Sequence, residues 1–208
     1  MKRIGVDESG KGDYFGYLVT CGVLVTDETA LTLAKLKVKD SKLLSDATVL
    51  RLAPKIKKIC PLEVVKVSPD AYNRLYVKFK SLNILLAWSH ARVIENLLEK
   101  HTADQVTVDK FADEKILNNI LFERGKKAKI IQKVRAESEI EVAAASVVAR
   151  AEFLRTLHVL SHDVGYLLPK GSTHVIADGK KIIQLYGKEM LPHVAKMHFK
   201  CTKKILGT

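Results

Sequence analysis

The chain has 208 residues, of which 47% are hydrophobic and 28% charged, with only 11 Gly and 5 Pro. This composition excludes a disordered or low-complexity chain, and no apolar run approaches the ~20 residues that a membrane span needs. Lys and Arg number 35 against 23 Asp and Glu, and the net charge of +12 favours polyanionic partners, although a solvated Lys-rich surface would explain it equally well.

The three cysteines, Cys21, Cys60 and Cys201, are far apart in the sequence, form no C-x-x-C pair and leave an odd count. This pattern is typical of buried thiols in a reducing compartment. The N-terminus reaches a charged turn by Asp7, too early for a signal peptide. We therefore expect a cytoplasmic protein without a membrane segment, and a monomer.

The first third of the chain predicts a hairpin, a helix and a further strand. Three segments have the Val-rich or alternating pattern of strands, namely residues 2–6, 17–26 and 62–67. The glycine-rich turn at 9–16 would join the first two strands into an antiparallel hairpin. Ser45 is placed to cap a helix through about residue 58, and Ser68-Pro69 would open a short helix.

The rest of the chain alternates between helices and strands. Residues 81–101 keep their apolar side chains on one face and form the clearest predicted helix. The segments that follow are a strand at 105–109, a helix at 113–124, a strand at 128–134, an Ala-rich helix at 138–160 and two later helical stretches. We expect one α/β domain over residues 1–208, in which helices flank a mixed sheet of about five strands and residues from about 161 form a helical C-terminal part.

The segment from Asp7 to Gly16 reads DESGKGDYFG and places two carboxylates beside a glycine-rich turn. Its glycines permit a ligand to approach the backbone closely. The segment is not a dinucleotide fingerprint, because Phe15 stands where a third glycine is needed, and no G-K-[ST] closes it as a phosphate loop. Taken alone, the acidic pair is more often a solvated strand end.

Two further acids lie near predicted strand ends. Asp109 ends the strand at 105–109, where it would project into the crevice at the sheet edge, although it could simply cap the next helix. Glu137 precedes Ser138, whose spacing to Glu141 matches a capping box, so Glu137 could simply be an acid favoured by a helix N-terminus. Each acid is ambiguous by itself.

Together the four acids fit a site for two divalent cations around a phosphodiester. Four carboxylates roughly balance two Mg²⁺ ions, and carboxylates packed so closely would repel one another unless cations kept them ionised. We therefore expect the metal ligands and catalytic residues to be Asp7, Glu8, Asp109 and Glu137.

The ordered motifs resemble ribonuclease H of the type 2 lineage, and more closely its type 3 branch, ribonuclease HIII. Besides residues 7–16, the similar segments are KDSKL at 39–43, AWSHAR at 87–92, AES at 136–138, AAASVVAR at 143–150 and AKMHFK at 195–200. Glu137 distinguishes the type 3 branch, since the type 2 pattern has aspartate at that place. The resemblance runs through the whole chain.

The resemblance implies a ribonuclease H-like fold and an endoribonuclease that cuts the RNA strand of RNA/DNA hybrids, leaving 5′-phosphate and 3′-hydroxyl ends. It implies that the four acids hold two Mg²⁺ or Mn²⁺ ions. The backbone of Gly10, Lys11 and Gly12 would read the minor groove at a ribonucleotide through its 2′-hydroxyl. Lys42 and Ser146 would contact phosphates.

Type 3 enzymes usually carry an N-terminal substrate-binding domain, whereas here the catalytic motif starts at Asp7, so we expect a catalytic domain without it. Basic segments could compensate by neutralising phosphates, and they are residues 55–58, 124–127 and 203–204. Each of them could equally be a solvated face.

Some other residues carry weaker signals. His158 and His162 are four apart on a predicted helix, but residue 159 is not Glu, so we expect ordinary helix histidines rather than a zinc site. Trp88 is expected to pack within its helix rather than stack on a base. Lys170 and His174 belong to a loop that could approach the site, although no spacing requires it.

Two alternatives stay open, a hybrid-binding protein without catalysis and another nuclease or integrase-like enzyme of the same fold, because a fold does not fix its substrate. The presence of all four acids argues against the first. The Gly-Lys-Gly turn and the type 3 segments argue against the second.

Overall fold

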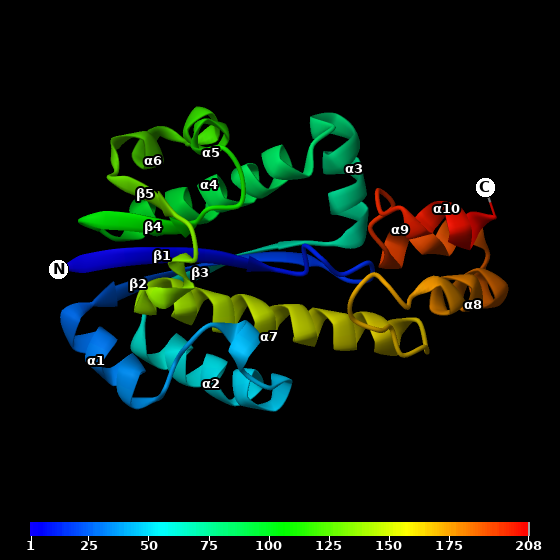
Figure 1. The fold of residues 1–208 in the computed structure, drawn as a ribbon, viewed down its shortest axis with the longest axis horizontal. Coiled ribbons are helices and arrows are strands. Elements are labelled where there is room, and N and C mark those ends of the chain that lie inside the picture. The colour runs from blue at the N-terminus through cyan, green and yellow to red at the C-terminus, as the bar shows by residue number, and fades with distance from the viewer. Residues whose placement is uncertain (208) are drawn as a thin grey trace.

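The computed structural model describes residues 1–207, and a five-stranded mixed sheet forms its centre (Figure 1). The spatial order is β3-β2-β1-β4-β5. The strands are β1 (Lys2–Ser9), β2 (Leu18–Thr26), β3 (Leu62–Val67), β4 (Gln105–Asp109) and β5 (Ile130–Lys133). β1 pairs antiparallel with β2 and parallel with β4, which confirms the predicted hairpin and mixed sheet.

Helices cover both faces of this sheet (Figure 1). On one side lie α4 (Leu82–Lys100), α5 (Glu114–Ile120) and α6 (Glu123–Lys127), and α3 (Pro69–Phe79) leads into them. On the other side lie α1 (Asp27–Lys35), α2 (Asp46–Ile59) and α7 (Ile140–Asp163). The C-terminal part holds α8 (Ile176–Tyr186), α9 (Leu191–Val194) and α10 (Cys201–Leu206). Within residues 1–207, no helix combines the length and the apolar character needed to cross a bilayer.

The helix expected at 113–124 is wrong in its extent, because two helices occupy this region. α5 ends at Ile120, and the next residue, Leu121, has a non-helical backbone and a buried side chain that packs in the cluster beneath α4. α6 then starts against Glu95 of α4, whose carboxylate accepts hydrogen bonds from the amides of Arg124 (3.0 Å) and Gly125 (3.1 Å). A tertiary contact therefore caps α6, and no local pattern predicts it. Helix α1 has no counterpart among the elements expected from the sequence.

The expected capping box of Ser138 with Glu141 is not formed. Ser138 lies in the 3₁₀ turn Ala136–Ser138, and its hydroxyl donates to the carbonyl of Arg135 at 3.2 Å. Glu141 is buried instead, where it accepts a hydrogen bond from Thr107 (3.4 Å) and lies 3.6 Å from the guanidinium of Arg3. Glu141 therefore joins α7 to β1 and β4 rather than capping its own helix.

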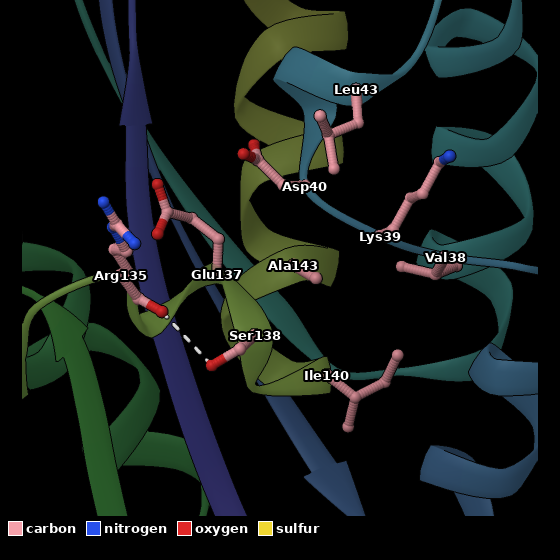
Figure 2. Close-up of a pocket in the computed structure, with 9 residues that line it drawn as sticks. All are labelled: Val38, Lys39, Asp40, Leu43, Arg135, Glu137, Ser138, Ile140 and Ala143. Atoms are coloured by element: carbon pink, nitrogen blue, oxygen red, sulfur yellow. Dashed lines mark hydrogen bonds between the residues drawn. The ribbon is translucent and has the colours of Figure 1, made fainter.

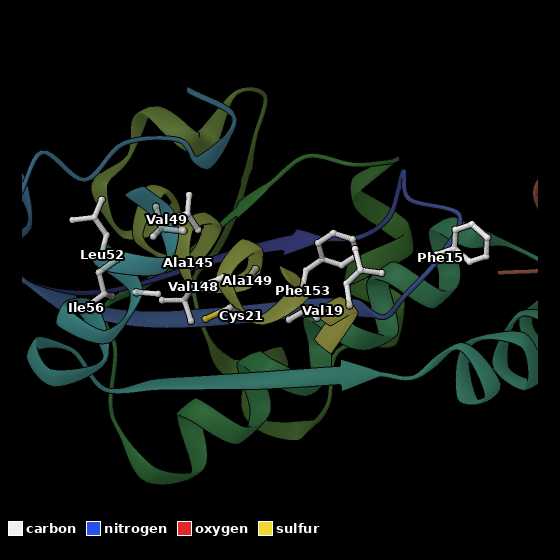
Figure 3. Packing of buried hydrophobic residues seen from close by; sticks show 14 of the residues in the cluster. Phe15, Val19, Cys21, Val49, Leu52, Ile56, Ala145, Val148, Ala149 and Phe153 are labelled. Atoms are coloured by element: carbon white, nitrogen blue, oxygen red, sulfur yellow. The ribbon is translucent and has the colours of Figure 1, made fainter. Parts of the chain in front are cut away.

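Helix α7 supplies the centre of the largest apolar cluster, shown in Figure 3. Its residue Val148 lies beside Cys21 of β2, and Phe153 lies beside Val19 of the same strand. The backbones of β1 and α7 approach so closely that a Cβ on Gly5 would lie 2.2 Å from the carbonyl carbon of Glu141. This packing holds the middle of β1 against the first turn of α7. The cluster also includes Leu168, Leu191 and Ile205 of the C-terminal part.

Candidate active site

The four acids lie at the carboxyl ends of three parallel strands. Strands β1, β4 and β5 run parallel, so their ends meet at one edge of the sheet. Asp109 is the last residue of β4, and Glu137 lies in the 3₁₀ turn after β5. The amide of Ala136 donates to Asp109 at 3.1 Å, which links these two strand ends.

Asp7 and Glu8 lie within the last residues of β1, because this strand extends to Ser9 and is longer than the strand expected at 2–6. They pair with Cys21 and Thr20 of β2. Because successive strand residues point to opposite faces, the two carboxylates project to different sides. Asp7 faces Ser146 on α7, and Glu8 faces the opposite side, where its Oε2 lies 3.0 Å from Nε2 of His90 on α4.

A cavity of about 180 Å³ unites three acids with all five predicted substrate-binding residues. Its lining includes Asp7, Glu8, Asp109, Gly10, Lys11, Gly12, Lys42 and Ser146, together with Ser9, Asp13, Ser41 and Arg150. Glu137 lines the neighbouring cavity of about 530 Å³ instead. Lys42 connects the two cavities, because its Nζ lies 2.8 Å from Oε1 of Glu137.

Figure 2 shows this neighbouring cavity between the segment Val38–Leu43 and the start of α7. Glu137 and Arg135 stand on one wall, and Asp40 stands across from them. Arg135 has φ +56°, an uncommon backbone conformation for a residue with a side chain. The turn that carries Glu137 is therefore held in a defined shape, and its first residue, Ala136, donates an amide hydrogen bond to Asp109.

Two of the acids repel other carboxylates in the site. Burial, and then the charge of Glu8, raise the pKa of Asp7 well above its ordinary value, and Asp109 adds to this effect. Burial also raises the pKa of Asp109, and the charges of Glu137 and Glu8 contribute. Glu8 is thus close enough to Asp7, and both Glu8 and Glu137 are close enough to Asp109, for their charges to oppose the ionisation of these two aspartates.

The other two acids are held ionised by cationic side chains. Burial opposes the ionisation of Glu8, but the hydrogen bond with His90 and the charge of Lys11 outweigh it and lower the pKa of Glu8 to about 2. Burial likewise opposes the ionisation of Glu137, but the hydrogen bond from Lys42 outweighs it and lowers the pKa of that carboxyl. The two lysines thus offset part of the negative charge.

With the side chains of residues 1–207 in their present positions, no group of three His, Cys, Asp or Glu residues is close enough together to hold a metal ion. The reason is local, because Glu8 is drawn to Lys11 at 2.7 Å and Glu137 to Lys42. The donor set itself fits a hard dication, since it consists of carboxylate oxygens. The raised pKa values of Asp7 and Asp109 fit it too, because an added cation would relieve the repulsion that raises them.

The glycine-rich turn has one tightly packed glycine and one open glycine. Gly10 has φ +89°, and a Cβ there would lie 2.1 Å from the carbonyl oxygen of Tyr17. Among residues 1–207, no atom lies within 4 Å of a Cβ built on Gly12. The backbone at Gly12 is therefore accessible, whereas Gly10 is required by the fold of the turn, and the predicted contact of both with a ribonucleotide stays a prediction.

The two predicted phosphate contacts differ in exposure. The side chain of Lys42 is 69% exposed, so its ammonium group can reach both Glu137 and an incoming anion. Ser146 is buried, and its hydroxyl lies 2.7 Å from that of Ser41. The phosphate role of Ser146 stays a prediction, and it would require this hydrogen bond to change.

The sequence reasoning assigned no role to three residues of the site. His90 is fully buried and orients Glu8; it lies in the AWSHAR segment on the inner face of α4, where helical spacing could have placed it. Arg150 lines the cavity beside the acids and donates to Asp46 of α2 at 3.0 Å. Asp13 accepts a hydrogen bond from the amide of Gly171 at 2.7 Å.

The remaining weak signals have mixed outcomes. The loop at Gly171 does approach the site, because Lys170 pairs with Asp46, which Arg150 also contacts. His158, His162 and His174 are exposed. Trp88 packs, as expected, against the apolar cluster that contains Tyr72 of α3 and Leu85 of α4, and its ring centroid lies 6.4 Å from that of Phe79.

Residues 4–202 match the family described as Ribonuclease HII. The chain is similar to "Ribonuclease HIII" of Protochlamydia amoebophila, with 44% identity over 99% of this chain and 68% of the relative. It is 46% identical to "Ribonuclease HIII" of Chlamydia felis, over 98% of this chain and 69% of the relative.

Among solved structures, Bst-RNase HIII in complex with Mn²⁺ has a TM-score of 0.93 and 33% sequence identity to this chain. The superposition covers 100% of this chain and 70% of that one. The ribonuclease H-like fold expected from the sequence is thereby confirmed.

Proposed function

Because the chain belongs to the ribonuclease HII family, and within it to the ribonuclease HIII branch, we propose that it is an endoribonuclease that hydrolyses the RNA strand of RNA/DNA hybrids. The products would carry 5′-phosphate and 3′-hydroxyl ends. The acids that would act are the four at the strand ends, Asp7, Glu8, Asp109 and Glu137.

These acids would hold two divalent cations, Mg²⁺ or Mn²⁺. When bound, such cations neutralise the phosphodiester and activate water for in-line attack. To bind these cations, Glu8 would separate from Lys11, and Glu137 would separate from Lys42. Both ammonium groups would then be free to contact phosphates. His90, held on α4, would keep the second oxygen of Glu8 in place.

The remaining cavity residues would bind the substrate. The open backbone at Gly12 lies beside Lys11 and Gly10, so the turn can approach a ribose and use its 2′-hydroxyl to distinguish RNA from DNA. Lys42 and Ser146 would contact phosphates next to the cut. We also propose that residues 1–207 act as one domain, because the C-terminal part shares the main apolar cluster.

The observation that most supports this proposal is electrostatic. Asp7 and Asp109 lie close enough to the other acids that burial and carboxylate charge raise the pKa values of both. A fold does not assemble such a repulsive group for stability, because each buried carboxylate costs free energy without a cation. The same cavity is lined by the glycine-rich turn and by three cationic side chains, those of Lys11, Lys42 and Arg150.

A substrate panel tests the proposal. The chain is incubated with Mg²⁺ and an end-labelled RNA/DNA hybrid, a DNA duplex or an RNA duplex of the same sequence. We expect cleavage of the RNA strand of the hybrid alone, with 3′-hydroxyl ends that a polymerase can extend. Binding of the hybrid without cleavage would favour the non-catalytic alternative, and equal cleavage of the DNA duplex would favour another nuclease of this fold.

A further inference from the structure

The C-terminal part is hydrogen-bonded to the second half of the glycine-rich turn, residues 13–16. Residues 13–16 receive or give hydrogen bonds at nearly every peptide unit. The amide of Tyr14 donates to the carbonyl of Gly171 (2.8 Å), and the amide of Gly16 donates to that of Val194 (2.9 Å). The amide of Lys196 donates in turn to the carbonyl of Tyr14 (2.9 Å). The shape of the turn therefore depends on residues far away in the sequence.

Lys196 lies at the centre of these contacts and is fully buried. Its ammonium group donates to the carbonyls of Asp13 (2.8 Å) and Gly16 (2.7 Å) and lies 3.5 Å from that of Phe15. Within the part of the chain that the structure describes, no salt bridge is formed by this group. A buried cation without a carboxylate partner is costly, and a methionine of similar length would pack there without that cost.

The ammonium group also lies 5.7 Å from the centroid of the Tyr72 ring, but its hydrogen bonds all go to the carbonyls of residues 13–16. Asp13 also donates its amide to the carbonyl of Gly10 at 3.3 Å, which closes the turn. An unbroken series of hydrogen bonds therefore runs from Lys196 through Asp13 to Gly10. The residues between Gly10 and Asp13 are Lys11 and Gly12, which line the cavity with the acids.

The segment that carries Lys196 is itself fixed from outside the C-terminal part. Asn73 of α3 donates to the carbonyls of Pro192 (2.9 Å) and Ala195 (2.9 Å) and accepts from the amide of Met197 (2.9 Å). Its side chain thus satisfies three backbone groups of one segment. Lys196 therefore projects from a rigid support.

We propose that Lys196 is a positioning residue, which fixes the glycine-rich turn in the shape that selects a ribonucleotide. The C-terminal part would then control substrate selection without touching the nucleic acid through this residue. This inference rests on the proposed function of the turn. Burial lowers the pKa of Lys196 to about 7, in keeping with the cost of placing a cation there.

Binding affinities test this role more directly than activity. Dissociation constants are measured in Mg²⁺ for an RNA/DNA hybrid and for a DNA duplex of equal length, in an Asp7→Asn background that prevents cleavage. Lys196→Met should weaken hybrid binding about tenfold and leave DNA-duplex binding almost unchanged, because the latter depends on phosphate charge. The matched control is Lys200→Met, which removes an exposed lysine four residues away and should preserve the preference for the hybrid.

The outcomes separate the two proposals. If the Asp7→Asn chain shows no preference for the hybrid over DNA, the proposed reading by the turn is wrong. If it prefers the hybrid and Lys196→Met keeps that preference, or weakens both duplexes equally, the role of Lys196 is wrong. Should Lys196→Met fail to fold, Asn73→Ser serves instead, because it frees the supporting segment and retains Lys196; an unchanged preference in this folded variant would equally overturn the inference.

Discussion

Adjacent acids on one strand reach opposite faces of the sheet. Asp7 meets α7 and Glu8 meets α4, so the two longest helices each hold one carboxylate of the pair. Their environments differ accordingly, because within residues 1–207 no lysine or arginine forms a salt bridge with Asp7, whereas Glu8 contacts Lys11 and the ring of His90. We therefore expect Asp7 to depend most on an added cation.

Replacing either aspartate should separate binding from cleavage. Asp7→Asn and Asp109→Asn each remove a proposed metal ligand with little change in shape, and the hydrolysis rate should fall about 10³-fold or more. Hybrid affinity should persist, since phosphate contacts remain. The matched control is Asp163→Asn at the exposed end of α7, for which we expect normal rates. Normal single-turnover rates in either site variant would refute the assignment of that residue.

At the scale of elements, α7 organises the site by lying directly under β1. Gly5→Ala should prevent this approach, because the added methyl would lie 2.2 Å from backbone atoms of α7 that cannot move aside. We expect a loss of about 3 kcal/mol in the free energy of unfolding, measured with urea. The methyl group of Gly12→Ala would meet no atom of the described chain within 4 Å, so this substitution should leave stability almost unchanged while weakening hybrid binding. Equal stability of the two variants would contradict the packing described here.

A second contact ties α7 to its neighbours and depends on pH. Burial opposes the ionisation of Glu152, but hydrogen bonds from Lys57 of α2, Lys66 of β3 and Arg155 outweigh it and lower the pKa from 4.5 to about 2. The carboxylate therefore contributes stability that is complete above about pH 5 and is lost as the pH falls toward 2.

The contribution at pH 7 should be about 2 to 3 kcal/mol. Glu152→Gln should be less stable than the unaltered chain by this amount at pH 7, and the difference should fall to less than half at pH 3. Glu123→Gln, which loses only the exposed pair with Lys126, should cost less than about 1 kcal/mol at either pH. A difference for Glu152→Gln that is independent of pH would show that its ionisation is not involved.

Local patterns predict the elements that carry their own signals. The caps Ser45, Ser68 and Ser81 all accept hydrogen bonds from the first turn of their helices, and the strand patterns give the sheet. The break between α5 and α6 depends on Glu95, about thirty positions earlier, and so has no local signal. The joint order of the motifs predicts the four acids. Lys196 lies in the AKMHFK segment, but no local pattern predicts its role, because its partners are carbonyl groups of a distant turn.

Over the whole molecule, the charge of +12 is not placed only around the site. Lys126 and Lys127 end α6, which precedes β5 and therefore lies toward the amino ends of the parallel strands, opposite to the acids. Lys126 also contacts Glu123. The placement favours the solvated-face interpretation of this basic segment, while Lys11, Lys42 and Arg150 line the cavity.

Salt dependence of hybrid binding distinguishes these two groups of cations. Replacing Lys42 with Met should reduce the slope of log affinity against log salt by about one unit, if Lys42 neutralises a phosphate. Replacing Lys126 and Lys127 together with Ser should leave the slope within about half a unit of its original value. A larger change from the α6 pair than from Lys42 would show that the hybrid extends over the opposite end of the sheet.

The requirement of the four acids for divalent cations can be measured directly. The chain is freed of metal with a chelator, and cleavage of an end-labelled RNA/DNA hybrid is followed as Mg²⁺ or Mn²⁺ is added back. We expect no cleavage in excess chelator and full recovery on addition of either cation. Cleavage of the hybrid that continues unchanged in excess chelator would contradict the account.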